Sequence, residues 1–217
     1  MVQGGHEPMR KSAERVIFIT VRHFMLAAAL SATLLTGDAP ACALEGDDVM
    51  LKRVAVGYAY PDSLYVLSAV SLAQLSGQLE RTPGIDATLT PAQRRAVILR
   101  IKRLLSKLSA RLTDHTPTDL PALSIVLLEP MLWSRIALKN GEPRLSIHVE
   151  GPTPGDVVAV TEVPVIAALV NGTLSARDAL SLGLIRLYGS APHLAAARIC
   201  LVTCDPPPAG LLSESGR

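Results

Sequence analysis

The sequence predicts an α+β fold, in which a helical N-terminal region is followed by a four- to five-stranded, mainly antiparallel sheet covered by helices. Between residues 47 and 114, apolar residues recur every three or four positions, as in amphipathic helices. After Pro117 and Pro121 this spacing changes to two, as in strands, and helical spacing returns after residue 161. Hydrophobic residues make up 49% of the 217 residues and charged residues 18%, which excludes a disordered chain.

The first 43 residues have the pattern of a secretory signal peptide. Four positive charges between Arg10 and Arg22 precede an uncharged stretch, Met25 to Thr36, and Ala41-Cys42-Ala43 offers a small-x-small cleavage site. This stretch is shorter than the roughly 20 apolar residues that span a bilayer. We therefore expect cleavage after Ala43 and a periplasmic or secreted protein. An uncleaved membrane anchor and lipid attachment at Cys42 are the alternatives.

Residues 44–116 are predicted to form a helical region. Pro61-Asp62-Ser63 is a start signal for a helix that runs to about Glu80, and Thr90-Pro91 begins a second one that ends near Leu112. The second helix carries seven positive charges and no acidic residue: Arg94, Arg95, Arg100, Lys102, Arg103, Lys107 and Arg111. They are either the solvated face of a packed helix or a surface that attracts an anionic membrane or an acidic partner. For the membrane alternative we assign the contact to Arg95, Lys102 and Arg103.

Four strands are expected next, at 123–128, 131–138, 145–149 and 157–160. Asn140-Gly141 between the second and third strands is a strong signal for a two-residue hairpin. Pro143 lacks a backbone N–H group, so the third strand should lie at an edge of the sheet.

The remaining elements are predicted from capping and stop signals. Thr161 is expected to cap a helix that contains Pro164 and ends at Asn171-Gly172. The sequence from Ser175 to Asp178 has capping-box spacing and opens a short helix that stops at Gly183. A strand at 184–188 and a last helix at 192–204 follow, and residues 205–217 are expected to be a disordered tail.

The C-terminal half resembles the sterol-carrier-protein family over residues 123–204. A sheet with an Asn-Gly hairpin is followed by a helix that ends in glycine, a short helix opened by Leu-Ser and a strand of the Leu-x-Leu-x-Gly type. The positions that match this pattern are Gly172, Leu174, Ser175, Ala179, Gly183, Ile185, Leu187 and Gly189. We accordingly take residues 117–204 as a sterol-carrier-like α+β domain.

The resemblance implies an apolar tunnel between the sheet and the helices at 162–171 and 175–182. We expect it to accept a lipid or another apolar molecule, lined by Val165, Ile166, Leu169, Val170, Leu180 and Leu187. The function expected on this basis is an exported, non-catalytic carrier of an apolar ligand. The alternative is a structural or adaptor protein of the envelope that binds a protein partner through its long helices.

No motif points to catalysis, a metal or a cofactor. The histidines outside the leader, His115, His148 and His193, have no metal-ligand spacing, and no Ser-His-acid arrangement can be identified. Aromatic residues make up 3% and the net charge is +2, so no nucleic-acid partner is expected. Cys200 and Cys204 are four residues apart on a predicted helix, which permits either a local disulfide or two buried thiols.

Overall fold

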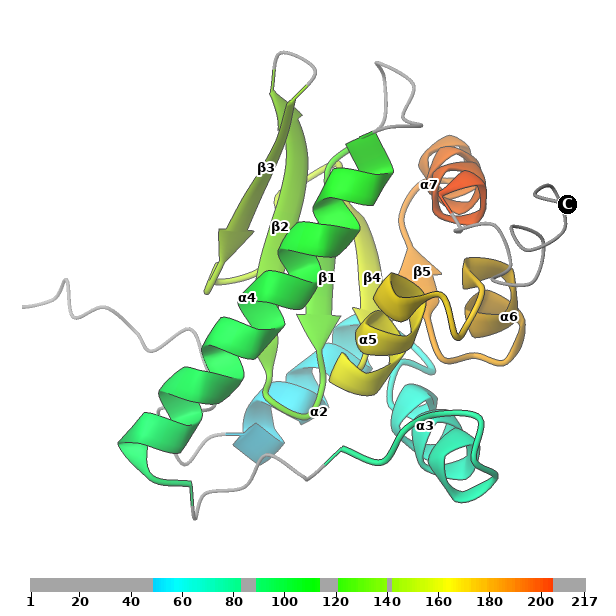
Figure 1. Ribbon diagram of the computed structural model, residues 1–217. Coiled ribbons are helices and arrows are strands. Elements are labelled where there is room, and N and C mark those ends of the chain that lie inside the picture. The colour runs from blue at the N-terminus through cyan, green and yellow to red at the C-terminus, as the bar shows by residue number, and fades with distance from the viewer. Residues whose placement is uncertain (1–48, 83–88, 114–120, 140–141, 205–217) are drawn as a thin grey trace, which may run out of the picture. The chain divides into compact units, whose positions relative to one another are not determined.

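The computed structural model describes residues 49–82, 89–113, 121–139 and 142–204 (Figure 1). All of them belong to one compact unit of the chain, Pro40–Arg217. The predicted signal peptide, 1–43, and the predicted tail, 205–217, lie outside the described residues. In the described ranges, every helix is too short or too polar to cross a membrane.

In the described part of the chain, three helices precede the sheet: α2 (Val49–Ala59), α3 (Tyr65–Leu75) and α4 (Pro91–Thr113). The helix predicted from Pro61 to Glu80 is shorter in the structure, because turns flank α3 and Gly77 has a positive φ of 77°. The start of α4 is as predicted. The backbone N–H of Thr90 donates to Oε1 of Gln93 (2.8 Å), and the backbone N–H of Gln93 donates to Oγ1 of Thr90 (3.3 Å).

The sheet has five strands in the order β3-β2-β1-β4-β5. Their bounds are Leu123–Leu127 (β1), Leu132–Lys139 (β2), Glu142–Ile147 (β3), Val157–Thr161 (β4) and Arg186–Tyr188 (β5). Of these neighbours, β1 and β4 run parallel and the other pairs run antiparallel. The predicted four- to five-stranded, mainly antiparallel sheet is confirmed.

The β2–β3 hairpin confirms the Asn-Gly signal. Lys139 pairs with Glu142, which leaves a two-residue connection, Asn140-Gly141, outside the described residues. β3 is an edge strand, as Pro143 predicted. The prediction that this strand extends to residue 149 is wrong, because β3 ends at Ile147 and His148 has a positive φ of 60°.

Helices α5 (Val163–Asn171), α6 (Ala176–Ser181) and α7 (Ala191–Thr203) complete the fold. The prediction that Thr161 caps α5 is wrong, because the N-cap residue is Glu162. Thr161 is instead the last residue of β4, and its Oγ1 donates to the carbonyl of Leu184 (2.9 Å). Gly172, with φ of 73°, ends α5 as expected.

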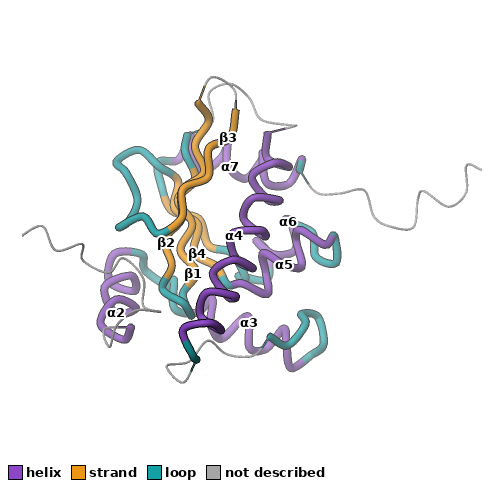
Figure 2. The backbone as a smooth tube through the Cα atoms, turned by 60° about the vertical axis from the view of Figure 1, so that its left-hand side comes forward, coloured by secondary structure: helices purple, strands orange, loops and turns teal. Residues whose placement is uncertain are grey.

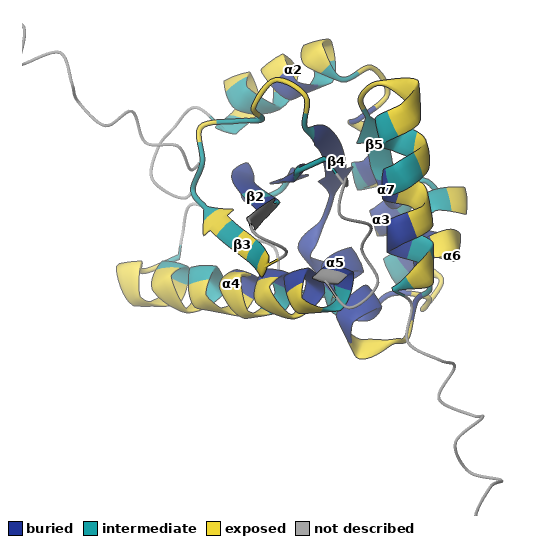
Figure 3. Ribbon diagram, turned by 90° about the horizontal axis from the view of Figure 1, so that it is seen from above, coloured by how far each residue is buried: buried dark blue, intermediate teal, exposed yellow. Residues whose placement is uncertain are grey.

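The helices lie on both sides of the sheet. α4 and α5 pack together on one side, and α2 lies on the other (Figure 2). On the α2 side, the ring of Tyr60 contacts those of Trp133 and Tyr188, with centroids 6.1 and 5.2 Å apart. β1 and β4 are buried along their whole length, whereas the edge strand β3 alternates between exposed and half-buried residues, as Figure 3 shows.

An ion pair fixes the centre of the sheet. Asp156 accepts hydrogen bonds from Nε and a second guanidinium nitrogen of Arg135 (2.8 and 2.9 Å), from Oγ of Ser124 (2.6 Å) and from the backbone N–H of Thr153 (3.0 Å). Burial alone would raise the pKa of Asp156, but these hydrogen bonds and the positive charge outweigh it and lower the pKa. The carboxylate therefore ties the start of β4 to β1 and β2.

Candidate functional site

A groove of about 840 Å³ lies between α6, β5 and α7. This volume is within the range of about 300–1,000 Å³ that is typical of small-molecule sites. The residues that line it are Arg177, Leu180, Ser181, Gly183, Ile185, Arg186, Leu187, Tyr188, Arg198, Ile199, Val202 and Thr203. All of them come from one continuous stretch of the chain, residues 177–203.

Local signals in this stretch shape the groove. The Oγ atom of Ser175 accepts the backbone N–H of Asp178 (3.0 Å) and so begins α6, which carries Arg177 and Leu180. Gly183, with a positive φ of 70°, then turns the chain toward β5. Pro192 lies in the first turn of α7, where its missing N–H group costs no helical hydrogen bond.

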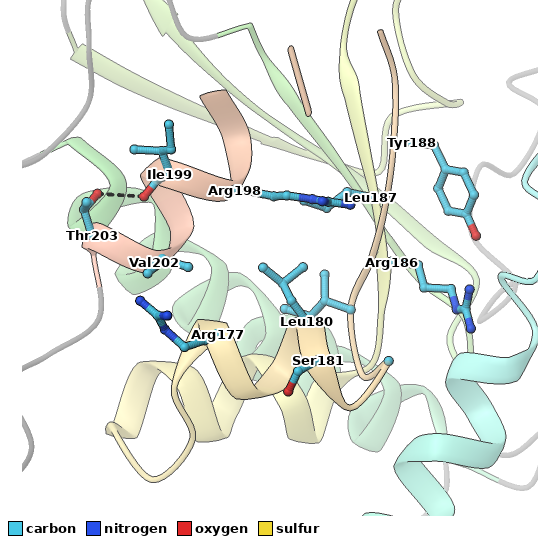
Figure 4. A pocket seen from close by; sticks show the side chains of 12 residues that line it. Arg177, Leu180, Ser181, Arg186, Leu187, Tyr188, Arg198, Ile199, Val202 and Thr203 are labelled. Atoms are coloured by element: carbon cyan, nitrogen blue, oxygen red, sulfur yellow. Dashed lines mark hydrogen bonds between the residues drawn. The ribbon is translucent and has the colours of Figure 1, made fainter. Parts of the chain in front are cut away.

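The side chains that face the groove are both aliphatic and positively charged. Figure 4 shows Leu180, Val202 and the guanidinium groups of Arg177 and Arg198 directed into the space between α6, α7 and β5. Arg186 and Tyr188 point to the opposite side of β5. There the phenol of Tyr188 donates to the carbonyl of Pro61 (2.7 Å), and Arg186 lies 3.9 Å from a carboxylate oxygen of Asp62.

The electrostatic character of the groove is positive. No Asp or Glu is among the described residues that line it, whereas Arg177 and Arg198 are exposed. In the part of the chain that the structure describes, neither of these two guanidinium groups forms an ion pair. The groove thus combines an aliphatic surface with two positive charges that are available to a ligand.

The six predicted ligand-binding residues are divided between the core and this groove. Val165, Ile166, Leu169 and Val170 of α5 are between 0% and 5% exposed and belong to the hydrophobic core. Leu180 and Leu187 line the groove. The structure therefore does not bring the six side chains together at one cavity. Leu180 and Leu187 lie at the groove beside α7, and Leu169 also lines a separate pocket of about 20 Å³.

The other predicted residues are separate from the groove. Arg95, Lys102 and Arg103 are exposed on α4. Cys200 and Cys204 lie on successive turns at the end of α7 with Sγ atoms 3.9 Å apart, which is a hydrogen-bond contact and longer than the bond of about 2 Å in a disulfide. Within the described ranges, no three His, Cys, Asp or Glu side chains are placed so that they could hold a metal ion.

A second polar feature lies at the junction of β4 and α5. The Glu162 side chain is buried, and its Oε1 accepts the backbone N–H of Glu129 (2.8 Å), while Oε2 has no hydrogen-bond partner among the described residues. Burial, together with the negative charge of Glu129, raises the pKa of Glu162 to about 8. Arg53 of α2 lies nearby and donates to the carbonyls of Leu128 and Glu129 (2.9 and 2.8 Å).

The sequence analysis did not single out Arg177 and Arg198. The two residues are 21 positions apart, and only the packing of α6 against α7 brings them to one groove. One local signal was present for Arg198, which is the single Lys, Arg, Asp or Glu residue in the largely apolar helix α7, whereas Arg177 stands beside Asp178 in α6. In such a segment a charged side chain is expected at the edge of the buried surface.

Comparison with known proteins finds likenesses in structure alone. No family model matches the sequence, and no curated protein matches it. Among solved structures, a sterol carrier protein 2 like protein from Aedes aegypti is 19% identical with a TM-score of 0.36, over 48% of this chain and 97% of that one. A conserved hypothetical protein from Thermus thermophilus, described as a possible sterol carrier protein, is 18% identical with a TM-score of 0.29, over 49% and 78%.

A third similar structure covers more of this chain. The stereoselective inverting sec-alkylsulfatase Pisa1 from Pseudomonas sp. is 18% identical with a TM-score of 0.35, over 71% of this chain and 27% of that one. At these identities and TM-scores the matches concern the fold and say nothing of ligand or reaction. Over about half of its length, the chain resembles sterol carrier protein 2 structures.

Proposed function

We propose that the protein is an exported, non-catalytic carrier that binds an amphiphile, a molecule with an apolar chain and an anionic head group, in the groove between α6, β5 and α7. The observation that carries this proposal is the combination of aliphatic side chains and two guanidinium groups without ion pairs in one groove of about 840 Å³.

The two parts of such a ligand would be bound by different forces. Burial of an alkyl chain against Leu180, Leu187 and Val202 contributes about 25 cal/mol per Å² of apolar area removed from water. A carboxylate, sulfate or phosphate head would accept charge-assisted hydrogen bonds from Arg177 and Arg198, which together contribute about 1–2 kcal/mol because both guanidinium groups are exposed to solvent. The head group therefore orients the ligand, while the chain supplies most of the buried area.

A binding experiment with two ligands of equal chain length tests this function. By isothermal titration calorimetry, we expect the protein to bind palmitate about ten-fold more tightly than hexadecanol, which has no negative charge. Arg177→Gln combined with Arg198→Gln should abolish this difference and leave hexadecanol binding unchanged. Leu180→Trp, which fills the groove, should weaken the binding of both ligands.

The matched control is Leu72→Trp, since Leu72 lies on the exposed side of α3 and does not line the groove. This variant should bind both ligands as the unmodified protein does. The proposal is wrong if the unmodified protein binds neither ligand, or if Leu180→Trp and Leu72→Trp have equal effects.

A second candidate function, an adaptor that binds a protein partner, is favoured by the exposed apolar side chains of α2 and α3. Met50, Leu51, Val54 and Tyr58 of α2 are 59–91% exposed, and Tyr65, Leu72 and Leu75 of α3 are 64–71% exposed. Apolar side chains that gather on helix surfaces in this way are typical of protein-interaction sites.

Native mass spectrometry of freshly isolated protein distinguishes the two functions. A bound amphiphile that is absent from the Leu180→Trp variant supports the carrier. An empty groove, together with a protein complex that Val54→Glu disrupts, supports the adaptor.

A further inference from the structure

The seven positive charges of α4 are not equivalent in the structure. Arg94 and Arg111 donate to the backbone carbonyls of Leu89 (3.0 Å) and Leu169 (2.9 Å). Arg100 lines a smaller cavity that Glu80 also lines. The other four, Arg95, Lys102, Arg103 and Lys107, are exposed and form no ion pair with any described residue. We call these four residues the cationic face of α4.

The composition around the cationic face differs from that of an ordinary solvated helix surface. Residues 91–113 contain no Asp or Glu, whereas exposed helix faces normally mix both signs. The other exposed residues from Arg95 to Ala110 are Ala96, Leu99, Arg100, Ser106 and Ala110, and Leu99 is 45% exposed. Figure 3 shows α4 with its exposed side turned away from the sheet.

The charge of α4 belongs to a wider asymmetry along the chain. Residues 49–113 hold ten Lys and Arg against three Asp and Glu, whereas residues 114–204 hold six against eight. A net charge near zero for the whole chain therefore conceals a strongly positive helical region, which an anionic surface would attract and orient.

We propose that the cationic face of α4 docks on the surface of an anionic lipid bilayer. The match is one of charge, since each Lys or Arg near such a surface strengthens binding by about five-fold. Four cations along one side of a helix can contact a flat anionic surface at the same time. Leu99 lies among them and adds apolar area that can enter the headgroup region. This inference goes beyond the proposed function, because it does not depend on what the groove binds.

A nucleic acid fits the cationic face less well than a bilayer does. α4 has no aromatic residue on which a base could stack, and its one side-chain amide, Gln93, is held in the hydrogen bonds with Thr90 at the start of the helix. The surface can therefore recognise negative charge but has no group that reads bases.

Vesicle sedimentation of the whole protein tests the proposal. We expect binding to vesicles of phosphatidylcholine mixed with phosphatidylglycerol, weaker binding at high salt, and little binding to phosphatidylcholine alone. Lys102→Gln combined with Arg103→Gln should weaken binding on the order of twenty-fold, at about five-fold per charge.

The matched control removes the same number of charges elsewhere, by Arg81→Gln with Arg144→Gln, two exposed residues outside α4. We expect a change of less than about three-fold, because charges away from the surface are screened. Thermal unfolding should be the same for both double variants. Equal loss in both of them, equal binding to charged and uncharged vesicles, or tighter binding to duplex DNA than to vesicles at the same salt would overturn the proposal.

Discussion

Glu162 is a buried carboxyl group whose protonation is coupled to folding. Its side chain is 2% exposed, and its Oε2 atom has no hydrogen-bond partner among the described residues. Burial first, and the charge of Glu129 second, raise its pKa from 4.5 to about 8, although Arg53 and the backbone N–H of Glu129 act in the opposite direction. The folded protein therefore holds this proton at neutral pH, and the unfolded chain does not.

This coupling predicts that Glu162 lowers stability as the pH rises. Between pH 4.5 and about 8 the folded state binds more protons than the unfolded state at this group, so its contribution to the unfolding free energy should fall by about 1 kcal/mol per pH unit. Glu162→Gln, which resembles the protonated acid, should remove this slope. Urea unfolding of both proteins across the same pH range measures the difference. Exposed Glu142→Gln is the control, and parallel curves for Glu162→Gln and the unmodified protein would contradict the expectation.

Cys200 and Cys204 remain the predicted site of a local disulfide. Their Sγ atoms are 3.9 Å apart at the C-terminal end of α7, so a bridge requires them to move about 2 Å closer, and export would place them in an oxidising compartment. In protein isolated from that compartment, we expect the intact mass to be lower by two hydrogen atoms and to increase by them on reduction. Alkylation of both thiols before any reduction would exclude the bridge.

At the scale of single elements, α6 depends on the hydrogen bonds between its N-cap residue, Ser175, and Asp178. Ser175 both accepts the backbone N–H of Asp178 (3.0 Å) and donates to Oδ2 of Asp178 (2.7 Å). A six-residue helix has little stability of its own, so this cap holds Arg177 and Leu180 at the groove.

Ser175→Ala should therefore lower the unfolding free energy by about 1 kcal/mol and weaken palmitate binding. The control is Ser190→Ala, because Ser190 occupies the same position before α7 but makes no capping hydrogen bond with its side chain. Urea unfolding and calorimetry measure the two effects. Similar results for the two variants would show that the hydrogen bond of Ser175 has no special role.

The sequence could predict elements but not which of them line a cavity. The capping pattern at Ser175, the glycine at 172 and the Asn-Gly hairpin are local signals, and the structure confirms the elements that they mark. The family resemblance implied a tunnel between the sheet and the helices, and four of its six expected lining residues belong to α5. However, seven of the nine residues of α5 are buried, and a helix that is apolar on all sides is expected in the core rather than at a binding surface.

At the scale of the whole described unit, the pairing of distant segments was beyond the sequence analysis. The parallel pairing of β1 with β4 joins segments that are about 30 residues apart, and no local residue pattern specifies it. The cavity beside α7 depends on the same long-range arrangement, since α6 and α7 contact each other and α7 contacts β4. The fold class and most element positions were therefore predictable, whereas the location of the groove and the role of its two arginines were not.

The three-residue strand β5 has a consequence for how a guest molecule would enter and leave. It is the last strand of the sheet and is joined to its neighbour through three residue pairs, Val158–Tyr188, Ala159–Leu187 and Val160–Arg186. Short edge strands of this kind open locally at a small fraction of the free energy of global unfolding. In the carrier function proposed above, loosening of β5 alone would widen the groove for a guest, while the interior strands keep their pairing.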